Sequence, residues 1–254
     1  MNVLEINNVT KRFGNLVAVR DVSLNVAKGE LCAIIGPNGA GKTTFFNLIS
    51  GFFPPTSGAI QFDGQDITRL STHERVVRGM ARTFQITEIF PELTVFENVR
   101  IAAEVAAGYR LRPWTNRTEA AAIHERVEDT LKMVSLETKT DRLVGELSHG
   151  DQRAAEIAMA LALKPRLLLL DEPTAGMRAE EKDSIVYLVN QAVSVLGCTM
   201  LLVEHDMKVV AGLVERVVVL DFGRMIFDGT PEQAQSDGRV IEAYLGTRKQ
   251  RAQL

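Results

Sequence analysis

The segment LCAIIGPNGAGKTTFFNLIS, residues 31–50, constrains the fold of this chain more than any other stretch. It begins as an apolar strand, breaks into a glycine-rich loop and continues with a helical pattern that Gly51 ends. The loop fits the pattern GxxxxGK followed by Ser or Thr, in which glycines let the backbone wrap a polyphosphate and aim N–H groups at it. The segment therefore predicts a phosphate-binding loop between a strand and a helix, with a plain glycine-rich turn as the alternative.

All residues of a loop of this kind contribute to binding the phosphates of a nucleotide. Lys42 is expected to reach the β- and γ-phosphates, and the Thr43 hydroxyl is expected to bind Mg²⁺. The predicted nucleotide-binding residues are Gly36, Pro37, Asn38, Gly39, Ala40, Gly41, Lys42, Thr43 and Thr44.

Two carboxylates end another apolar strand, in the segment LLLLDE at residues 167–172. Ligands bind beyond the carboxyl ends of strands in open α/β sheets, so these side chains are candidates for the chemistry of the bound phosphates. Asp171 is predicted to hold Mg²⁺, directly or through water, and Glu172 to polarise the attacking water as a general base. The alternative is an acidic pair that caps a helix after a buried strand.

Two further polar residues lie where strands are expected to end. His205 follows the apolar segment TMLLVE, and its ring could reach a γ-phosphate or serve only a structural role. Gln85 lies in ARTFQITEIF, where the strand-rich part of the chain meets the helical part. Its amide is a candidate contact to Mg²⁺ or to the attacking water, although most glutamines are simply solvated.

A second anion site is predicted where the segment GELSHGDQRAAEIAMALAL, residues 145–163, starts a helix. Ser148 brings a hydroxyl and Gly150 a bare backbone amide to the first turn of that helix, which is how proteins often hold anions. The chain thus has two expected phosphate sites about a hundred residues apart.

Strand-like segments in the first and last thirds of the chain flank a helical pattern that runs from about residue 88 to residue 163. This arrangement favours an α/β fold, with a core from residues 1–88 and 164–254 and a helical segment, residues 89–163, inserted between its strands. The net charge of −3 gives no indication of nucleic-acid binding. The apolar runs are too short to span a bilayer, so we expect any contact with a membrane to be made through a partner.

Taken in order, the phosphate loop, Gln85, LSHGDQR, LLLLDE and His205 resemble the ATP-binding cassette (ABC) ATPases over nearly the whole chain. The resemblance implies a P-loop NTPase fold over residues 1–254: a RecA-like α/β core, an antiparallel β subdomain and an inserted helical subdomain. In that family the segment matching LSHGD is the signature motif. It closes over the γ-phosphate bound by the other subunit of a head-to-tail dimer.

The resemblance also implies roles for particular residues and partners. Phe13 matches the aromatic residue that stacks on adenine, and Ser148 and Gly150 match the signature contacts to the opposite ATP. The implied cofactors are ATP and Mg²⁺. The helical insertion, with the region after Gln85, matches the subdomain that grips the cytoplasmic loops of a transmembrane partner.

Two departures from the family pattern affect these expectations. The signature reads LSHGD where the family usually has LSGGQ, so His149 replaces a glycine and Asp151 a glutamine. Asp151 suits a helix N-terminus but would repel a γ-phosphate. The family usually has an aspartate near Met177 and Arg178 that links the two sites of the dimer, and it is missing here.

Within the family, the chain most resembles the ATPases of branched-chain amino acid importers. The resemblance rests on the insert RLRPWTNRTEAAAIHERVEDTLKMVSL, on DEPTAGM and VEHDMKVV, and on the ending DGTPEQAQSDGRVIEAYLG. It implies two permease subunits, a second ABC ATPase, an indirect role for a solute-binding protein, and a place at the cytoplasmic face of the inner membrane. The alternatives are a urea, amide or other amino acid importer, a lipopolysaccharide exporter, or an ABC ATPase without a permease.

Overall fold

The computed structural model describes residues 1–83, 89–108 and 117–251, with side chains described up to residue 245. The chain divides into two compact units, which are described separately below. The first comprises Met1–Arg78 and Thr199–Leu254, and the second Gly79–Cys198. The predicted site residue Gln85 lies outside the described residues.

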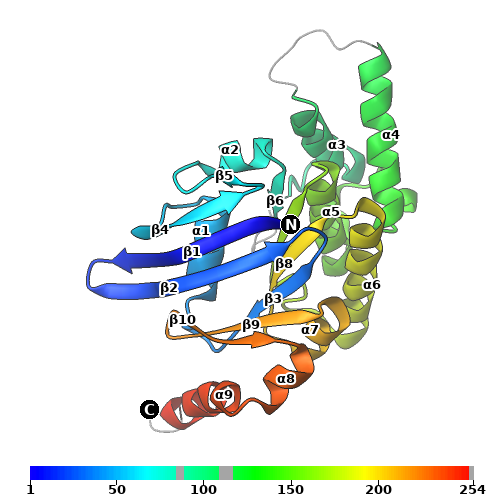
Figure 1. Ribbon diagram of the computed structural model, residues 1–254. Helices are drawn as coiled ribbons and strands as arrows, with labels where there is room; N and C mark the ends of the chain where they lie inside the picture. The colour runs from blue at the N-terminus through cyan, green and yellow to red at the C-terminus, as the bar shows by residue number, and fades with distance from the viewer. Residues whose placement is uncertain (84–88, 109–116, 252–254) are drawn as a thin grey trace. The chain divides into compact units, whose positions relative to one another are not determined.

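An antiparallel sheet in the first unit has the strand order β2-β1-β4-β5 (Figure 1). Its strands are β1 (Asn2–Phe13), β2 (Leu16–Ala27), β4 (Ser57–Phe62) and β5 (Gln65–Asp66). The sequence predicted short strands here, but β1 and β2 have 12 residues each. They stay paired through several register shifts, because bulges let a long hairpin twist without ending the ladder.

A second set of strands in the same unit surrounds β3 (Leu31–Ile35), which leads into the phosphate loop. β3 is parallel to both β8 (Thr199–Val203) and β9 (Arg216–Asp221), and β10 (Arg224–Gly229) is antiparallel to β9. All five residues of β8 are buried, as expected for a parallel strand covered on both faces.

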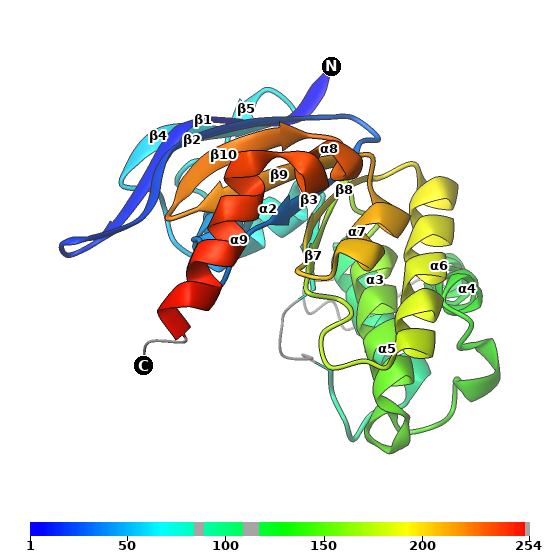
Figure 2. The same ribbon diagram turned by 90° about the horizontal axis from the view of Figure 1, so that it is seen from below.

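The helices of the first unit are α1 (Lys42–Ser50), α2 (Thr72–Val77), α7 (Met207–Leu213), α8 (Pro231–Ser236) and α9 (Gly238–Arg251). α2, α7 and α8 each begin at a capping side chain, and α1 ends at Gly51. Thr230 caps α8 and Pro231 occupies its first turn. Figure 2 shows α8 and α9 beside β9 and β10.

A buried arginine that the sequence did not reveal holds the end of α1. The last carbonyl groups of a helix lack partners within the helix. Here the Arg75 guanidinium, only 1% exposed, donates to the carbonyl oxygens of Leu48 at 2.8 Å and Ile49 at 2.7 Å. It donates to Ile67 at 2.6 Å as well, so α2 fixes the helix that follows the phosphate loop.

The second unit pairs β6 (Met80–Arg82) in parallel with β7 (Leu167–Asp171) and contains the helices between these strands in sequence and a helix after β7. These helices are α3 (Val95–Ala106), α4 (Arg117–Met133), the 3₁₀ helices η1 (Glu137–Lys139) and η2 (Val144–Glu146), α5 (His149–Ala162) and α6 (Ala179–Leu196). Figure 2 shows α3, α5 and α6 packed side by side.

Ile123, Val127 and Leu131 form a buried apolar face of α4. The compact unit is larger than the predicted helical segment, residues 89–163, since it also contains β6, β7 and α6. The subdomain boundaries drawn from the sequence stay a prediction.

Both cysteines are buried thiols: Cys32 is 0% exposed and Cys198 is 3% exposed. Burial raises the pKa of Cys32 to about 12 and also raises the pKa of Cys198. Only the thiolate is a nucleophile, so neither residue should react with a disulfide reagent at pH 8 while the chain is folded. We expect the native protein to release no reagent thiolate quickly. In concentrated urea, both cysteines should react with the reagent. Fast release without denaturant would contradict the structure.

Candidate nucleotide and signature sites

The phosphate loop, between β3 and α1, requires glycine at two positions. A side chain at Gly36, where φ is +148°, would place its Cβ 2.1 Å from the carbonyl oxygen of Leu220. At Gly41, where φ is +96°, the Cβ would lie 2.5 Å from the carbonyl oxygen of Ala18. The loop is therefore enclosed by β2 on one side and by the end of β9 on the other, and its shape depends on backbone that only glycine can form.

Lys42 carries a buried positive charge at this loop. Its ammonium group donates to the carbonyl oxygens of Gly36 at 2.7 Å and Pro37 at 3.0 Å. Gly41 precedes α1 without any side-chain cap, while Thr43 is exposed in the first turn. A helix N-terminus without a side-chain cap, next to a lysine and a hydroxyl, has the donors that a nucleotide phosphate needs.

Phe13, the predicted adenine contact, ends β1 and is 46% exposed. Its ring meets the ring of Phe53 edge-on, with the centroids 5.4 Å apart. The Lys11 ammonium lies 5.2 Å from the Phe13 centroid and 4.6 Å from that of Phe53. The sequence singled out Phe13 but not Phe53, and together they form an accessible aromatic surface in the unit that contains the phosphate loop.

His205 also belongs to the first unit, directly after β8, and its side chain is 56% exposed. The preceding residue, Glu204, is fully buried, and its carboxylate accepts from the backbone amides of His205 at 3.0 Å and Asp206 at 3.4 Å. Glu204 thus fixes the backbone of His205 at the end of the strand. The signal that could have revealed it is the one used for Asp171: a carboxylate at the end of an apolar strand.

Asp171 and Glu172 lie in the second unit, at the end of β7. The Asp171 carboxylate accepts from the Arg82 guanidinium at 2.7 Å, and the two side chains are only 3% and 8% exposed. Arg82 ends the neighbouring strand β6, so the parallel pairing of the two strands brings this cation to the predicted Mg²⁺ ligand. The sequence did not single out Arg82.

We predict that Arg82→Met lowers the free energy of unfolding by about 3 kcal/mol, because it leaves the buried Asp171 carboxylate without its cation. The matched control is Arg100→Met, which breaks an exposed pair with Glu104 in α3. That change should cost less than about 0.5 kcal/mol. Urea unfolding of both variants measures the difference, and equal costs would show that the Arg82 pair contributes no more than a surface pair.

Glu172 has an unusual backbone conformation that α5 stabilises. Its φ of +46° is in the left-handed region, which residues other than glycine rarely adopt. The carbonyl groups on both sides of it accept from the buried Arg153 guanidinium: Asp171 at 2.8 Å and Pro173 at 3.1 Å. Glu156, one turn further along α5, pairs with Arg153. A side chain on the signature helix therefore positions the backbone of the predicted general base.

Ser148 and Gly150 lie at the start of α5, as the sequence predicted. Ser148 is the N-cap residue, and its hydroxyl oxygen accepts from the backbone amide of Asp151 at 3.2 Å. Ser148 and Gly150 line an open cavity of about 550 Å³, whose other walls come from the end of α4 and the first half of α6. A Cβ on Gly150 would meet only the Cγ of Glu181, at 4.0 Å, so the space in front of this helix start is open.

The predicted site residues are thus divided between the units. The phosphate loop, Phe13 and His205 lie in the first, and Asp171, Glu172, Ser148 and Gly150 lie in the second. Within residues 1–83, 89–108 and 117–251 there is no group of three or more His, Cys, Asp or Glu that could hold a metal ion.

Comparison with known proteins finds similarity over almost the whole chain. The family model for ABC transporters matches residues 19–175, and the model described as "Branched-chain amino acid ATP-binding cassette transporter" matches residues 224–249. The chain is 41% identical to "High-affinity branched-chain amino acid transport ATP-binding protein BraF" from Pseudomonas aeruginosa. That alignment covers 96% of this chain and 98% of BraF.

Two solved structures show the same fold. The ATP-binding cassette MJ1267 superposes with a TM-score of 0.83 and 31% identity, covering 96% of this chain and 99% of that one. The cassette MJ0796, solved as a dimer in a post-hydrolysis state with ADP and phosphate, superposes with a TM-score of 0.75 and 28% identity. It covers 90% of this chain and 98% of that one. The chain belongs to the ABC transporter family, as an ATP-binding cassette.

Proposed function

We propose that this chain is the ATP-hydrolysing subunit of an importer for branched-chain amino acids. The observation that carries the proposal is the match over residues 224–249 to a family model described by that transport system. This region contains all of β10 and α8 and most of α9, and it lies outside the part of the chain that matches the general ABC model. The full-length similarity to BraF supports the same assignment.

The chemical step follows from the residues assigned above. Lys42 and the amides of the phosphate loop bind and orient the triphosphate, and Phe13 stacks on the adenine. Thr43, Gln85 and Asp171 are the residues assigned to Mg²⁺, which would supply positive charge to the phosphates. Glu172 accepts a proton from the attacking water, and Lys42 and His205 stabilise the charge that develops on the γ-phosphate.

The second anion site couples ATP hydrolysis to movement of the ATPase subunits. Ser148 and Gly150 line an open cavity in their own unit, at the start of α5. We assign them to the γ-phosphate of ATP bound by a facing ATPase subunit, either a second copy or a related chain. The MJ0796 dimer supports such pairing in a similar cassette. Two bound ATP molecules then hold the subunits together, and hydrolysis with phosphate release lets them separate.

The movement is proposed to drive two transmembrane permease subunits, to which a solute-binding protein delivers the amino acid. Within the described ranges of the chain, no helix is long and apolar enough to cross a membrane. Binding to the permease subunits would place the chain at the cytoplasmic face of the inner membrane.

The test is uptake by the complete transporter, purified with the permease subunits that bind this chain and reconstituted into vesicles with its solute-binding protein. We expect ATP-dependent uptake of leucine, isoleucine and valine, which Glu172→Gln abolishes. Uptake of urea or another amide instead would reassign the solute while keeping the transport function. ATP hydrolysis by a chain that binds no permease would contradict the proposal.

A further inference from the structure

The aspartate in the signature, Asp151, does not face the cavity as a bare charge. Its carboxylate Oδ2 accepts from the Lys139 ammonium at 2.7 Å and from the Ser148 hydroxyl at 2.8 Å. The Ser148 oxygen in turn accepts from the amide of Asp151. One lysine, one aspartate and the signature serine therefore form a single hydrogen-bonded group at the start of α5.

Lys139 is held in place by its backbone. It ends η1, where its amide donates to the carbonyl oxygen of the buried Leu136 at 2.9 Å and its own carbonyl accepts from Arg142 at 3.1 Å. The carbonyl of the next residue, Thr140, accepts from Phe96 in α3 at 3.0 Å. The Lys139 side chain is 33% exposed and that of Asp151 is 25% exposed, so this pair is partly shielded from solvent.

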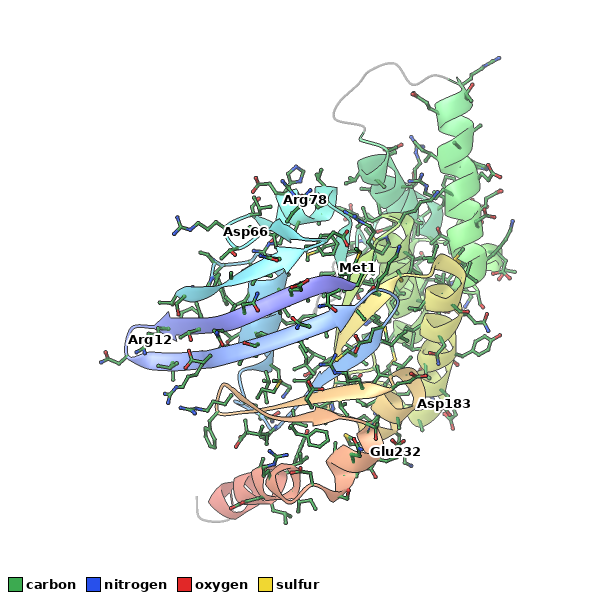
Figure 3. All side chains as sticks on the ribbon, in the orientation of Figure 1. Met1, Arg12, Asp66, Arg78, Asp183 and Glu232 are labelled. Atoms are coloured by element: carbon green, nitrogen blue, oxygen red, sulfur yellow. The ribbon has the colours of Figure 1, made fainter. Side chains whose placement is uncertain are left out.

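The surroundings make this positive charge important for an incoming anion. The cavity lined by Ser148, Gly150 and Asp151 also has Glu181 and Asp183 in its wall, the latter labelled on α6 in Figure 3. Arg178 pairs with Glu181 at 3.0 Å. An ATP phosphate that approaches Ser148 therefore meets carboxylates in the cavity wall, and Lys139 is the cation in contact with the carboxylate that accepts from the Ser148 hydroxyl.

We propose that Lys139 is a positioning residue of the signature, which makes a signature containing aspartate compatible with ATP. The proposal rests on the assignment of Ser148 and Gly150 to the ATP of the facing subunit. Lys139 offsets the Asp151 charge that would otherwise repel the γ-phosphate. By sharing the Asp151 carboxylate with Ser148, it also weakens the hold of Asp151 on the serine hydroxyl, which must donate to the phosphate instead.

The test measures ATP-driven association of the full chain with its facing ATPase subunit, in a Glu172→Gln background that prevents hydrolysis. Lys139→Met is expected to raise the dissociation constant of the ATP-bound dimer at least about tenfold, while ATP binding by the separate chain is unchanged. Lys132→Met is the matched control. It removes a lysine that pairs with Asp129 on the exposed side of α4, and it should leave association unchanged.

A double-mutant comparison separates this role from a purely structural one. In a chain that already carries Asp151→Asn there is no carboxylate to offset, so adding Lys139→Met should change the dissociation constant by less than about twofold. A tenfold loss that persists in the Asp151→Asn background would overturn the proposal, as would normal association of the Lys139→Met chain. If the parent chain fails to associate with ATP at all, the assignment of the signature to a facing subunit fails, and this proposal fails with it.

Discussion

Glu172→Gln is expected to lower steady-state ATP turnover by about 10²–10⁴-fold, the usual contribution of a general base. The new side chain has the same shape but cannot accept the proton of the attacking water. The left-handed backbone at this position is retained, because Arg153 holds the carbonyl groups on either side of it. ATP binding should persist, and the ATP-bound dimer should accumulate because phosphate is not released. Turnover and gel filtration with ATP measure the two effects.

The control is Glu180→Gln, an exposed carboxylate in the first turn of α6, which should turn over ATP at the normal rate. Normal steady-state turnover by Glu172→Gln would remove Glu172 from the role of base. A variant that no longer binds ATP would indicate that the substitution disturbs the nucleotide site itself.

Gly150→Ala is expected to lower ATP turnover by about 10²-fold. An effect of this size is typical of losing a hydrogen-bond donor that stabilises charge in a transition state. The chain itself has room for the new methyl group, which would meet only Glu181 at 4.0 Å. The fold and nucleotide binding by the separate chain should therefore be unchanged. The methyl group would instead intrude into the space that the facing subunit's γ-phosphate needs, so ATP-driven association should be lost.

The matched control is Gly238→Ala, which also adds a methyl group in the first turn of a helix, with nothing within 4 Å of it. It should leave association and turnover unchanged. Loss of ATP binding by the separate Gly150→Ala chain would indicate that Gly150 acts on the nucleotide of its own chain.

Where the facing subunit is a second copy, mixing two inactive variants tests the same point. A dimer of one Lys42→Ala chain and one Gly150→Ala chain retains one site with an intact phosphate loop and an intact signature. We expect the mixture to recover part of the turnover that each variant lacks alone. If each chain used only its own signature, the mixture would stay inactive.

The elements that the sequence predicted best are those with local signals. The strand, loop and helix around Lys42 were predicted because apolar residues, glycines and a terminating Gly51 follow one another directly. The start of α5 was predicted because Ser148 brings a side-chain hydroxyl to the amides that follow it.

The residues that the sequence did not reveal act on distant parts of the chain. Arg75 and Arg153 both bind backbone carbonyl groups that lie in other elements. Every residue type has such a carbonyl group, so the sequence gives no signal of these contacts. Arg82 meets Asp171, 89 residues later, only because β6 and β7 pair. The sequence predicted that Asp151 would repel a phosphate. It did not show that Lys139 pairs with Asp151, because only the fold brings that lysine to the signature.

The central claim is that Ser148 and Gly150 belong to the nucleotide site of a facing subunit. The most direct measurement is a cryo-electron microscopy structure of the complete transporter containing Glu172→Gln, with ATP and Mg²⁺. The account predicts that the Ser148 hydroxyl and the Gly150 amide lie within about 3 Å of γ-phosphate oxygens of the ATP bound to the facing subunit's phosphate loop. ATP in the phosphate loops with Ser148 and Gly150 exposed to solvent, or in contact with the ATP of their own chain, would contradict it.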